Sequence, residues 1–353
     1  MGIGSKMPEM LMNIDKTISE LLQGLIFDSP EMLSPLIREF SNFVLRPGKR
    51  IRPLLLILTY LGYSKDDEVE KITESVYKLA AILEIMHAFL LVHDDVIDES
   101  TLRRGEPTLH KIYEKMYKNE KIGKDLAIIV GDIASFYYFG KLSELEIDKD
   151  NIKAILKLFS ECYVKTGYGQ LLDILYTGNI SHQAMLTDIP TKISLLKTSY
   201  YTFVYPMIFG YYLSGTRDDE EVTKLRLIGE KIGIAFQYRD DILGTFGGEA
   251  KSANDITEGK YTILIKKTYD LLNERERETF LNLVAKKDVE GVQRYIVKSG
   301  ALERTKVEIT KLMDETLSLL AELKMKEECK MEIERIISKI KEVPGTHGGG
   351  MNG

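Results

Sequence analysis

Apolar side chains recur along most of this chain at the three- and four-residue spacing of an amphipathic α-helix, and the alternation typical of strands is scarce. Proline and glycine fall mostly between these stretches and divide the chain into segments of helical length. No repeat of about 20–50 residues is evident, which excludes a solenoid. The pattern predicts helices at residues 8–24, 31–45, 51–62, 68–98, 121–143, 150–178, 191–213, 218–246, 257–272, 275–284, 287–298 and 302–341, the last of them interrupted.

The long apolar helices and the lack of a low-complexity linker predict a single all-α domain over residues 1–343. The Gly-rich end PGTHGGGMNG, residues 344–353, is expected to be disordered. The most apolar run, residues 76–92, is interrupted by Lys78, Glu84 and His87. We therefore expect it to be a buried core helix, and we expect no membrane span.

Composition narrows the class of protein further. The chain of 353 residues has a formal net charge of −6, which disfavours a nucleic-acid-binding protein. Its two cysteines, Cys162 and Cys329, form no CxxC pair, which excludes a disulfide scaffold and a thiolate zinc cluster and suits a reducing cytoplasm. The first residues lack a basic stretch followed by an apolar run, so we expect no signal peptide and a cytoplasmic protein.

Carboxylates gather where the most apolar helix ends. In the stretch HDDVID, Asp94 and Asp98 are four residues apart and share one helix face, with Asp95 about 100° round from Asp94. Like charges this close repel each other unless a cation neutralises them. Carboxylate oxygens are hard ligands, and Mg²⁺ typically shares a few of them with substrate phosphates. The stretch therefore predicts a Mg²⁺ site, although a solvated helix end would carry the same residues.

A second apolar helix ends in the same way. The stretch FQYRDDILG delivers Asp240 and Asp241 near the end of the helix expected at 218–246. The C-terminus of a helix carries partial negative charge, so aspartates there are unfavourable without a cation. If both helices enter one cavity, the two clusters hold a metal group between them, a geometry that clamps a diphosphate.

Cationic residues accompany both acidic clusters. The stretch RPGKRIRP, residues 46–53, opens a helix whose free backbone N–H groups also attract an anion. His87 lies two helical turns before Asp94 on the same face, where it either binds a phosphate or is a core residue. The basic side chains that could meet a diphosphate are Arg46, Lys49, Arg50, Arg52, Arg103, Arg104, Lys197, Lys251 and Lys260.

Together these residues resemble the polyprenyl synthetase family, the all-α trans-isoprenyl diphosphate synthases. The resemblance rests on GKRIRP (48–53), HDDVID with ESTLRRG (93–105), KTS (197–199) and FQYRDDILG with its DITEGK follow-on (236–260), in that order along residues 30–270. Within this family the chain resembles the archaeal short-chain geranylgeranyl diphosphate synthases. The resemblance implies a helix bundle around a deep central cavity, three Mg²⁺ ions per site and a homodimer.

The resemblance also implies an activity, the head-to-tail joining of isopentenyl diphosphate to dimethylallyl, geranyl or farnesyl diphosphate by ionisation, condensation and elimination. The Mg²⁺ ligands would be Asp94, Asp98 and Asp240, supported by Asp95 and Asp241. Isopentenyl diphosphate would be bound by Lys49, Arg52, His87 and Arg104. The allylic diphosphate and the reacting centre would meet Arg103, Lys197, Thr198, Gln237, Lys251 and Lys260, with Gln170 and Asp173 behind them.

Two features leave questions open. The second motif reads DDILG, so Gly244 stands where the family usually has an aspartate, which removes one possible ligand of the third metal. Phe89 lies five residues before Asp94, about 7.5 Å down the helix, with Leu90 above it. A Phe that blocks the growing chain there implies a C20 product, geranylgeranyl diphosphate, whereas a Phe in the core allows C25 or longer. A C15 product, a terpene cyclase, a squalene-synthase-like enzyme and a non-catalytic subunit of a heteromeric synthase stay open as alternatives.

Overall fold

The computed structural model describes residues 2–65, 72–103, 105–248 and 253–342, and the prediction of an all-α fold is confirmed by a model that is 81% helical. The chain divides into two compact units, each built from several segments. Unit 1 comprises residues 1–158, 206–217 and 325–332. Unit 2 comprises residues 159–205, 218–324 and 333–353.

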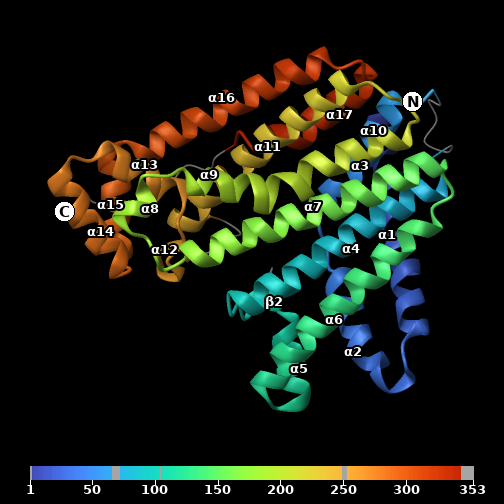
Figure 1. Ribbon diagram of the computed structural model, residues 1–353, viewed down its shortest axis with the longest axis horizontal. Helices are drawn as coiled ribbons and strands as arrows, with labels where there is room; N and C mark the ends of the chain where they lie inside the picture. The colour runs from blue at the N-terminus through green and yellow to red at the C-terminus, as the bar shows by residue number, and fades with distance from the viewer. Residues whose placement is uncertain (1, 66–71, 104, 249–252, 343–353) are drawn as a thin grey trace. The chain divides into compact units, whose positions relative to one another are not determined.

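Unit 1 is organised around one buried helix. Helix α4 (Glu74–Ile97) packs against α1 (Ile3–Asp28), α3 (Ile51–Tyr63) and α6 (Glu120–Lys141), as Figure 1 shows. From Ser75 to Ala88 only Lys78 is not fully buried, so the apolar run expected to be a core helix does lie in the core. The unit also contains η1 (Glu31–Leu33), α2 (Ser34–Val44), β1 (Leu102–Arg103), β2 (Glu106–Pro107), α5 (Leu109–Tyr117), η3 (Leu142–Glu144), the start of α7 (Lys149–Tyr176), most of α10 (Tyr205–Leu213) and the start of α17 (Glu327–Ser338).

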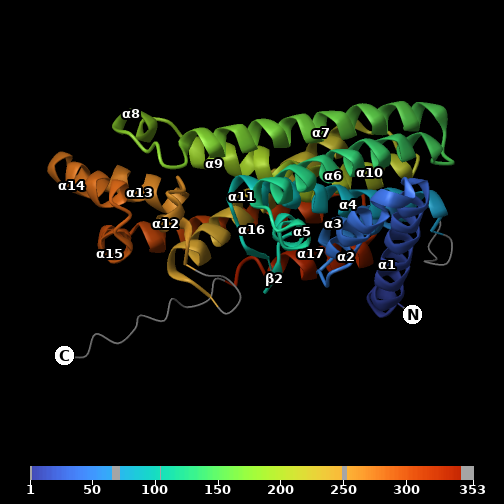
Figure 2. The same cartoon turned by 90° about the horizontal axis from the view of Figure 1, so that it is seen from below.

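Unit 2 is organised around α11 (Asp219–Phe246), which packs against η4 (Ser194–Val204) and α16 (Ala301–Glu322). Short helices gather beside each other at one end of the unit, where α13 and α14 both pack against α15 (Figure 2). The remaining elements of this unit are the later part of α7, α8 (His182–Met185), α9 (Ile189–Ile193), α12 (Asp255–Glu258), α13 (Ile263–Leu271), α14 (Glu274–Ala285), α15 (Val289–Ser299) and the end of α17.

Four local predictions were wrong. The helix expected at 257–272 is interrupted, because residues 259–262 between α12 and α13 are not helical. The helix expected from residue 68 begins at Glu74, because Ile72 and Thr73 are not helical. The stretch expected to be a single helix at 191–213 consists of α9, the π-helix η4 and α10. The hairpin β1–β2 and helix α5 were not expected, since paired strands of two residues show no alternation that a sequence pattern can reveal.

Candidate active site

In unit 1, helix α4 carries the first acidic cluster at its C-terminal end. Asp94 and Asp98 are partly accessible, whereas Asp95 is 1% exposed. Asp98 caps the helix, and its backbone N–H donates to the carbonyl oxygen of Asp94 over 2.8 Å. The helix therefore presents the two carboxylates that share its face and buries the one between them.

Asp95 is held by Arg103 from the β1–β2 hairpin. The Arg103 guanidinium donates through Nε to both carboxylate oxygens, over 2.8 and 2.9 Å, and its Nη2 lies 2.6 Å from Oδ1. Burial raises the pKa of Asp95, and the hydrogen bond and charge of Arg103 partly offset that rise. Nη2 also lies 3.6 Å from Oδ2 of Asp94. Asp95 thus fixes the position of Arg103 beside Asp94.

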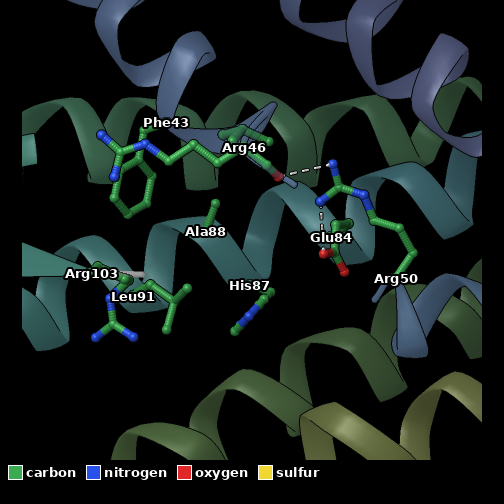
Figure 3. Close-up of a pocket in the computed structure, with 9 residues that line it drawn as sticks. Phe43, Arg46, Arg50, Glu84, His87, Ala88, Leu91 and Arg103 are labelled. Atoms are coloured by element: carbon green, nitrogen blue, oxygen red, sulfur yellow. Dashed lines mark hydrogen bonds and ion pairs between the residues drawn. The ribbon is translucent and has the colours of Figure 1, made fainter. Parts of the chain in front are cut away.

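A small basic pocket lies along α4 in the same unit (Figure 3). Arg50 reaches it from a left-handed backbone conformation, with φ of 49°, which is strained for a side chain of this size. Its guanidinium pairs with Glu84 over 3.1 Å and with Asp15 over 2.8 Å. Because Arg50 and Glu84 are both almost fully buried, this pair fixes the loop before α3 to the middle of α4.

The structure places the residues predicted to bind isopentenyl diphosphate as follows. His87 is buried and lines the basic pocket with Arg46, Arg50, Glu84 and Arg103. Arg52 is half-buried in the first turn of α3, and Lys49 is exposed just before it. Arg104 lies outside the described residues.

Glu84 had no assigned role from the sequence, although a signal was present. It is a charged residue in the middle of the most apolar run, one turn before His87. Arg46 was recognised as basic, but its contacts could not be foreseen. Its Nη2 donates to the carbonyl oxygen of Pro107 over 2.8 Å, so it joins the loop before α3 to the hairpin that carries Arg103.

In unit 2, η4 brings Lys197 and Thr198 to two different neighbours. Lys197 Nζ lies 2.6 Å from Oδ2 of Asp173 on α7, with Gln170 half-buried one turn earlier. The hydroxyl of Thr198 donates to Oε1 of Gln237 on α11 over 2.8 Å. The structure therefore brings Asp173 to Lys197 and Gln237 to Thr198.

A chain of hydrogen bonds continues from Thr198 to the second acidic cluster. Nε2 of Gln237 donates to Oδ1 of Asp241 over 3.0 Å, and the backbone N–H of Ile263 donates to Oδ2 over 2.9 Å. Asp241 is 6% exposed, whereas Asp240 beside it is partly accessible. The two acidic clusters therefore have the same arrangement. The first aspartate of each pair is accessible, and the second is buried and bound by donors of the protein.

Gly244 and the remaining basic residues complete this end of α11. A Cβ built at Gly244 would lie 2.1 Å from Oδ2 of Asp255, so the carboxylate of Asp255 fills the space beside this glycine. Lys260 is half-buried and pairs with Glu258 over 3.1 Å. Lys251 lies outside the described residues.

The donor chemistry of both acidic ends fits Mg²⁺. Among the described residues no group of three or more His, Cys, Asp or Glu side chains is arranged to enclose a metal ion. Mg²⁺ is usually held by one or two carboxylates, several waters and substrate phosphates instead of an all-protein cage. Asp94 and Asp98 in unit 1, and Asp240 in unit 2, are accessible carboxylates that would fit such a partial shell.

Phe89 lies on α4 and is partly accessible. Its ring meets the ring of His93 edge-on, with the centroids 4.7 Å apart. A methyl group at Gly131 of α6 would come within 3.4 Å of Cδ2 of Phe89 and within 2.7 Å of Nε2 of His93. Leu90 is also half-buried.

Known proteins match this chain in sequence over most of its length. Residues 34–299 match the family model described as polyprenyl synthetase. A short chain isoprenyl diphosphate synthase of Methanocaldococcus jannaschii is 29% identical over 79% of this chain and 80% of that protein. A geranylgeranyl diphosphate synthase of Saccharolobus solfataricus is 32% identical over 68% of each chain.

A solved structure extends the likeness to three dimensions. The geranylgeranyl pyrophosphate synthase of Corynebacterium glutamicum, in complex with isoprenyl diphosphate and magnesium, is 26% identical and covers 96% of this chain and 99% of its own, with a TM-score of 0.84. The chain belongs to the polyprenyl synthetase family, a family of prenyltransferases. The resemblance seen in the sequence motifs is thereby confirmed.

Proposed function

We propose that this protein is a Mg²⁺-dependent isoprenyl diphosphate synthase that condenses isopentenyl diphosphate with allylic diphosphates to give geranylgeranyl diphosphate. The observation that carries the proposal is the common plan of the two acidic clusters. In each, an accessible aspartate stands beside a buried one that is used to hold a neighbouring side chain, Arg103 for Asp95 and Gln237 for Asp241. A terpene cyclase needs no pocket for isopentenyl diphosphate, so the basic pocket around His87 favours the synthase.

The residues of the chain would divide the work between two diphosphates. His87 with Arg52 and Lys49 would hold isopentenyl diphosphate, and Arg103 and Lys197 would hold the allylic diphosphate. Bound Mg²⁺ would neutralise the charge that develops on the diphosphate as the allylic C–O bond breaks. The hydroxyl of Thr198 and the amide of Gln237, already hydrogen-bonded to each other, would orient their dipoles toward the cationic carbon. The isopentenyl double bond would then attack the cationic carbon, and the released diphosphate would accept the proton that leaves the isopentenyl unit as its new double bond forms.

The product length of C20 rests on Phe89. Its partial accessibility and its contact with His93 leave the ring available to stop a growing chain a few C5 units below Asp94. Relatives are named for products of several lengths, among them farnesyl, geranylgeranyl and geranylfarnesyl diphosphate. The family alone therefore does not set the length, and the proposal of C20 is specific to this residue.

We further propose a homodimer that works in the cytoplasm without a membrane span. In the described part of the chain, the two helices α4 and α6 are long and apolar enough to cross a membrane, and 72% of the apolar window of α4 is buried inside the protein. Helix α6 instead exposes one face, at Ile122, Ile129, Ile133 and Phe136. Exposed stripes of this kind mark interaction sites in proteins, and a second copy of the chain would cover this one.

The test supplies purified protein and Mg²⁺ with labelled isopentenyl diphosphate and, in separate reactions, a C5, C10 or C15 allylic primer. The dephosphorylated products are then sized. Elongation of every primer to C20 is expected. Absence of elongation with all three primers would refute the proposed synthase activity, and cyclic hydrocarbon products would favour a terpene cyclase. Chains of C25 or longer would retain the synthase and reject Phe89 as the stop.

A further inference from the structure

Three glycines face η4, the segment that carries Lys197 and Thr198. Helix η4 is a π-helix of 11 residues, whereas most π-helical segments are single-turn bulges and many lie at functional sites. Such winding is weaker than α-helical winding, so something outside the segment must maintain it. The contacts of η4 with α7 and α11 supply that support.

On α7, Gly169 lets the backbone of η4 come very close. A Cβ at this position would lie 2.3 Å from the backbone nitrogen and 2.6 Å from the Cα of Lys197. No side chain fits in that space, because the atoms in the way belong to the backbone. One helical turn later on the same face of α7, Asp173 meets Nζ of Lys197.

Helix α11 repeats this arrangement on another side of η4. A Cβ at Gly233 would lie 2.4 Å from Cα of Ser199, and one at Gly229 would lie 2.7 Å from Cα of Val204. One turn after Gly233 on the same face, Gln237 accepts the hydrogen bond of Thr198. Both neighbours of η4 therefore follow one pattern, a glycine and then, four residues later, a polar partner.

Glycine inside a helix lowers helix stability relative to alanine, so three interior glycines at one contact indicate a requirement for space. We propose that Gly169, Gly229 and Gly233 are positioning residues that hold the π-helical segment close enough for Lys197 to reach Asp173 and for Thr198 to reach Gln237. They set the geometry of the allylic end of the site without touching substrate. This inference rests on the proposed function.

The test compares Gly169→Ala and Gly233→Ala with a matched control on α7. Gly167 is two residues before Gly169, and a Cβ there would meet nothing within 4 Å. In the synthase assay, kcat/KM for the allylic diphosphate is expected to fall about tenfold to hundredfold in the two test variants. The KM for isopentenyl diphosphate should stay unchanged, and Gly167→Ala should match the wild type in both constants.

A loss of stability alone would not lower kcat/KM for the allylic diphosphate while leaving the KM for isopentenyl diphosphate unchanged. Ile228→Ala removes a buried side chain of α11 and serves as a variant of reduced stability; it should keep the wild-type KM for both substrates. Asp173→Asn changes no volume and weakens only the contact with Lys197, so it should show the same selective loss even if a glycine variant fails to fold.

The outcomes separate this inference from the proposed function. A wild-type protein without synthase activity refutes the function itself. An active wild type whose Gly169→Ala and Gly233→Ala variants keep the wild-type kcat/KM for the allylic diphosphate overturns the positioning role. Equal losses for both substrates would overturn it as well, and if neither glycine variant folds, the kinetics of Asp173→Asn decide.

Discussion

At Gly244 the structure predicts that the aspartate implied by the sequence motif would be destabilising. The family resemblance of the motif implies an aspartate at this position, so Gly244→Asp would restore the implied pattern. In this chain the carboxylate of Asp255 already fills that space, since a Cβ at residue 244 would lie 2.1–2.4 Å from its carboxylate atoms. Asp255 is only 8% exposed and has little room to move. Restoring the aspartate is therefore expected to destabilise the protein.

The size of the effect follows from two contributions. Forcing a side chain into a filled space costs about 1–3 kcal/mol. Two carboxylates in contact add a repulsion of about one pKa unit, roughly 1.4 kcal/mol. The free energy of unfolding should therefore fall by about 2–4 kcal/mol.

The assay is urea-induced unfolding followed by circular dichroism. Gly244→Ala separates the two contributions, because it adds the steric clash without the charge. Adding Asp255→Ala to Gly244→Asp should recover most of the stability, since it empties the occupied space. If Gly244→Asp is as stable as the wild type, the close packing of Asp255 against residue 244 is wrong.

Three further predictions follow from the described contacts. Asp94→Asn should abolish turnover with little loss of stability, because the Asp94 carboxylate is partly accessible. Asp95→Asn should cost about 2–3 kcal/mol of stability, because it removes the buried charge that pairs with Arg103. Kinetics and urea unfolding of both variants check the contrast, and equal stabilities would contradict it. Phe89→Ala should lengthen the product, and an unchanged C20 product would place the stop elsewhere. Burial lowers the pKa of His110 below its usual 6.5, with help from nearby lysines. The contribution of neutral His110 to stability is therefore complete above pH 6.5 and falls as the pH drops below 6.5, and His110→Phe should reduce this loss of stability in acid. A wild type that is equally stable at pH 7 and pH 5 would refute this prediction.

Much of the site could be predicted because its main features are local. Asp94 and Asp98 share a face through helical periodicity alone, and the apolar run before them identified α4 as a core helix. The chemistry of a carboxylate pair near a helix end likewise needs no tertiary information. These features reappear in the structure close to where the sequence placed them.

The missed features depend on contacts between distant residues. The π-helical winding of η4 accompanies glycines on α7 and α11 that lie 25 or more residues away in the sequence. The apolar pattern of 191–213 alone therefore predicts an ordinary helix. The left-handed backbone of Arg50 accompanies its contacts with Glu84 and Asp15. The space beside Gly244 is filled by Asp255, eleven residues later, which no pattern of helical spacing reveals.

The most direct measurement of the central claim is the mass of the product formed from farnesyl diphosphate and excess isopentenyl diphosphate in the presence of Mg²⁺. A single addition that stops at C20 is expected, with no product when the Mg²⁺ is chelated. Failure to incorporate isopentenyl diphosphate under these conditions, or equal incorporation after chelation, would contradict this claim.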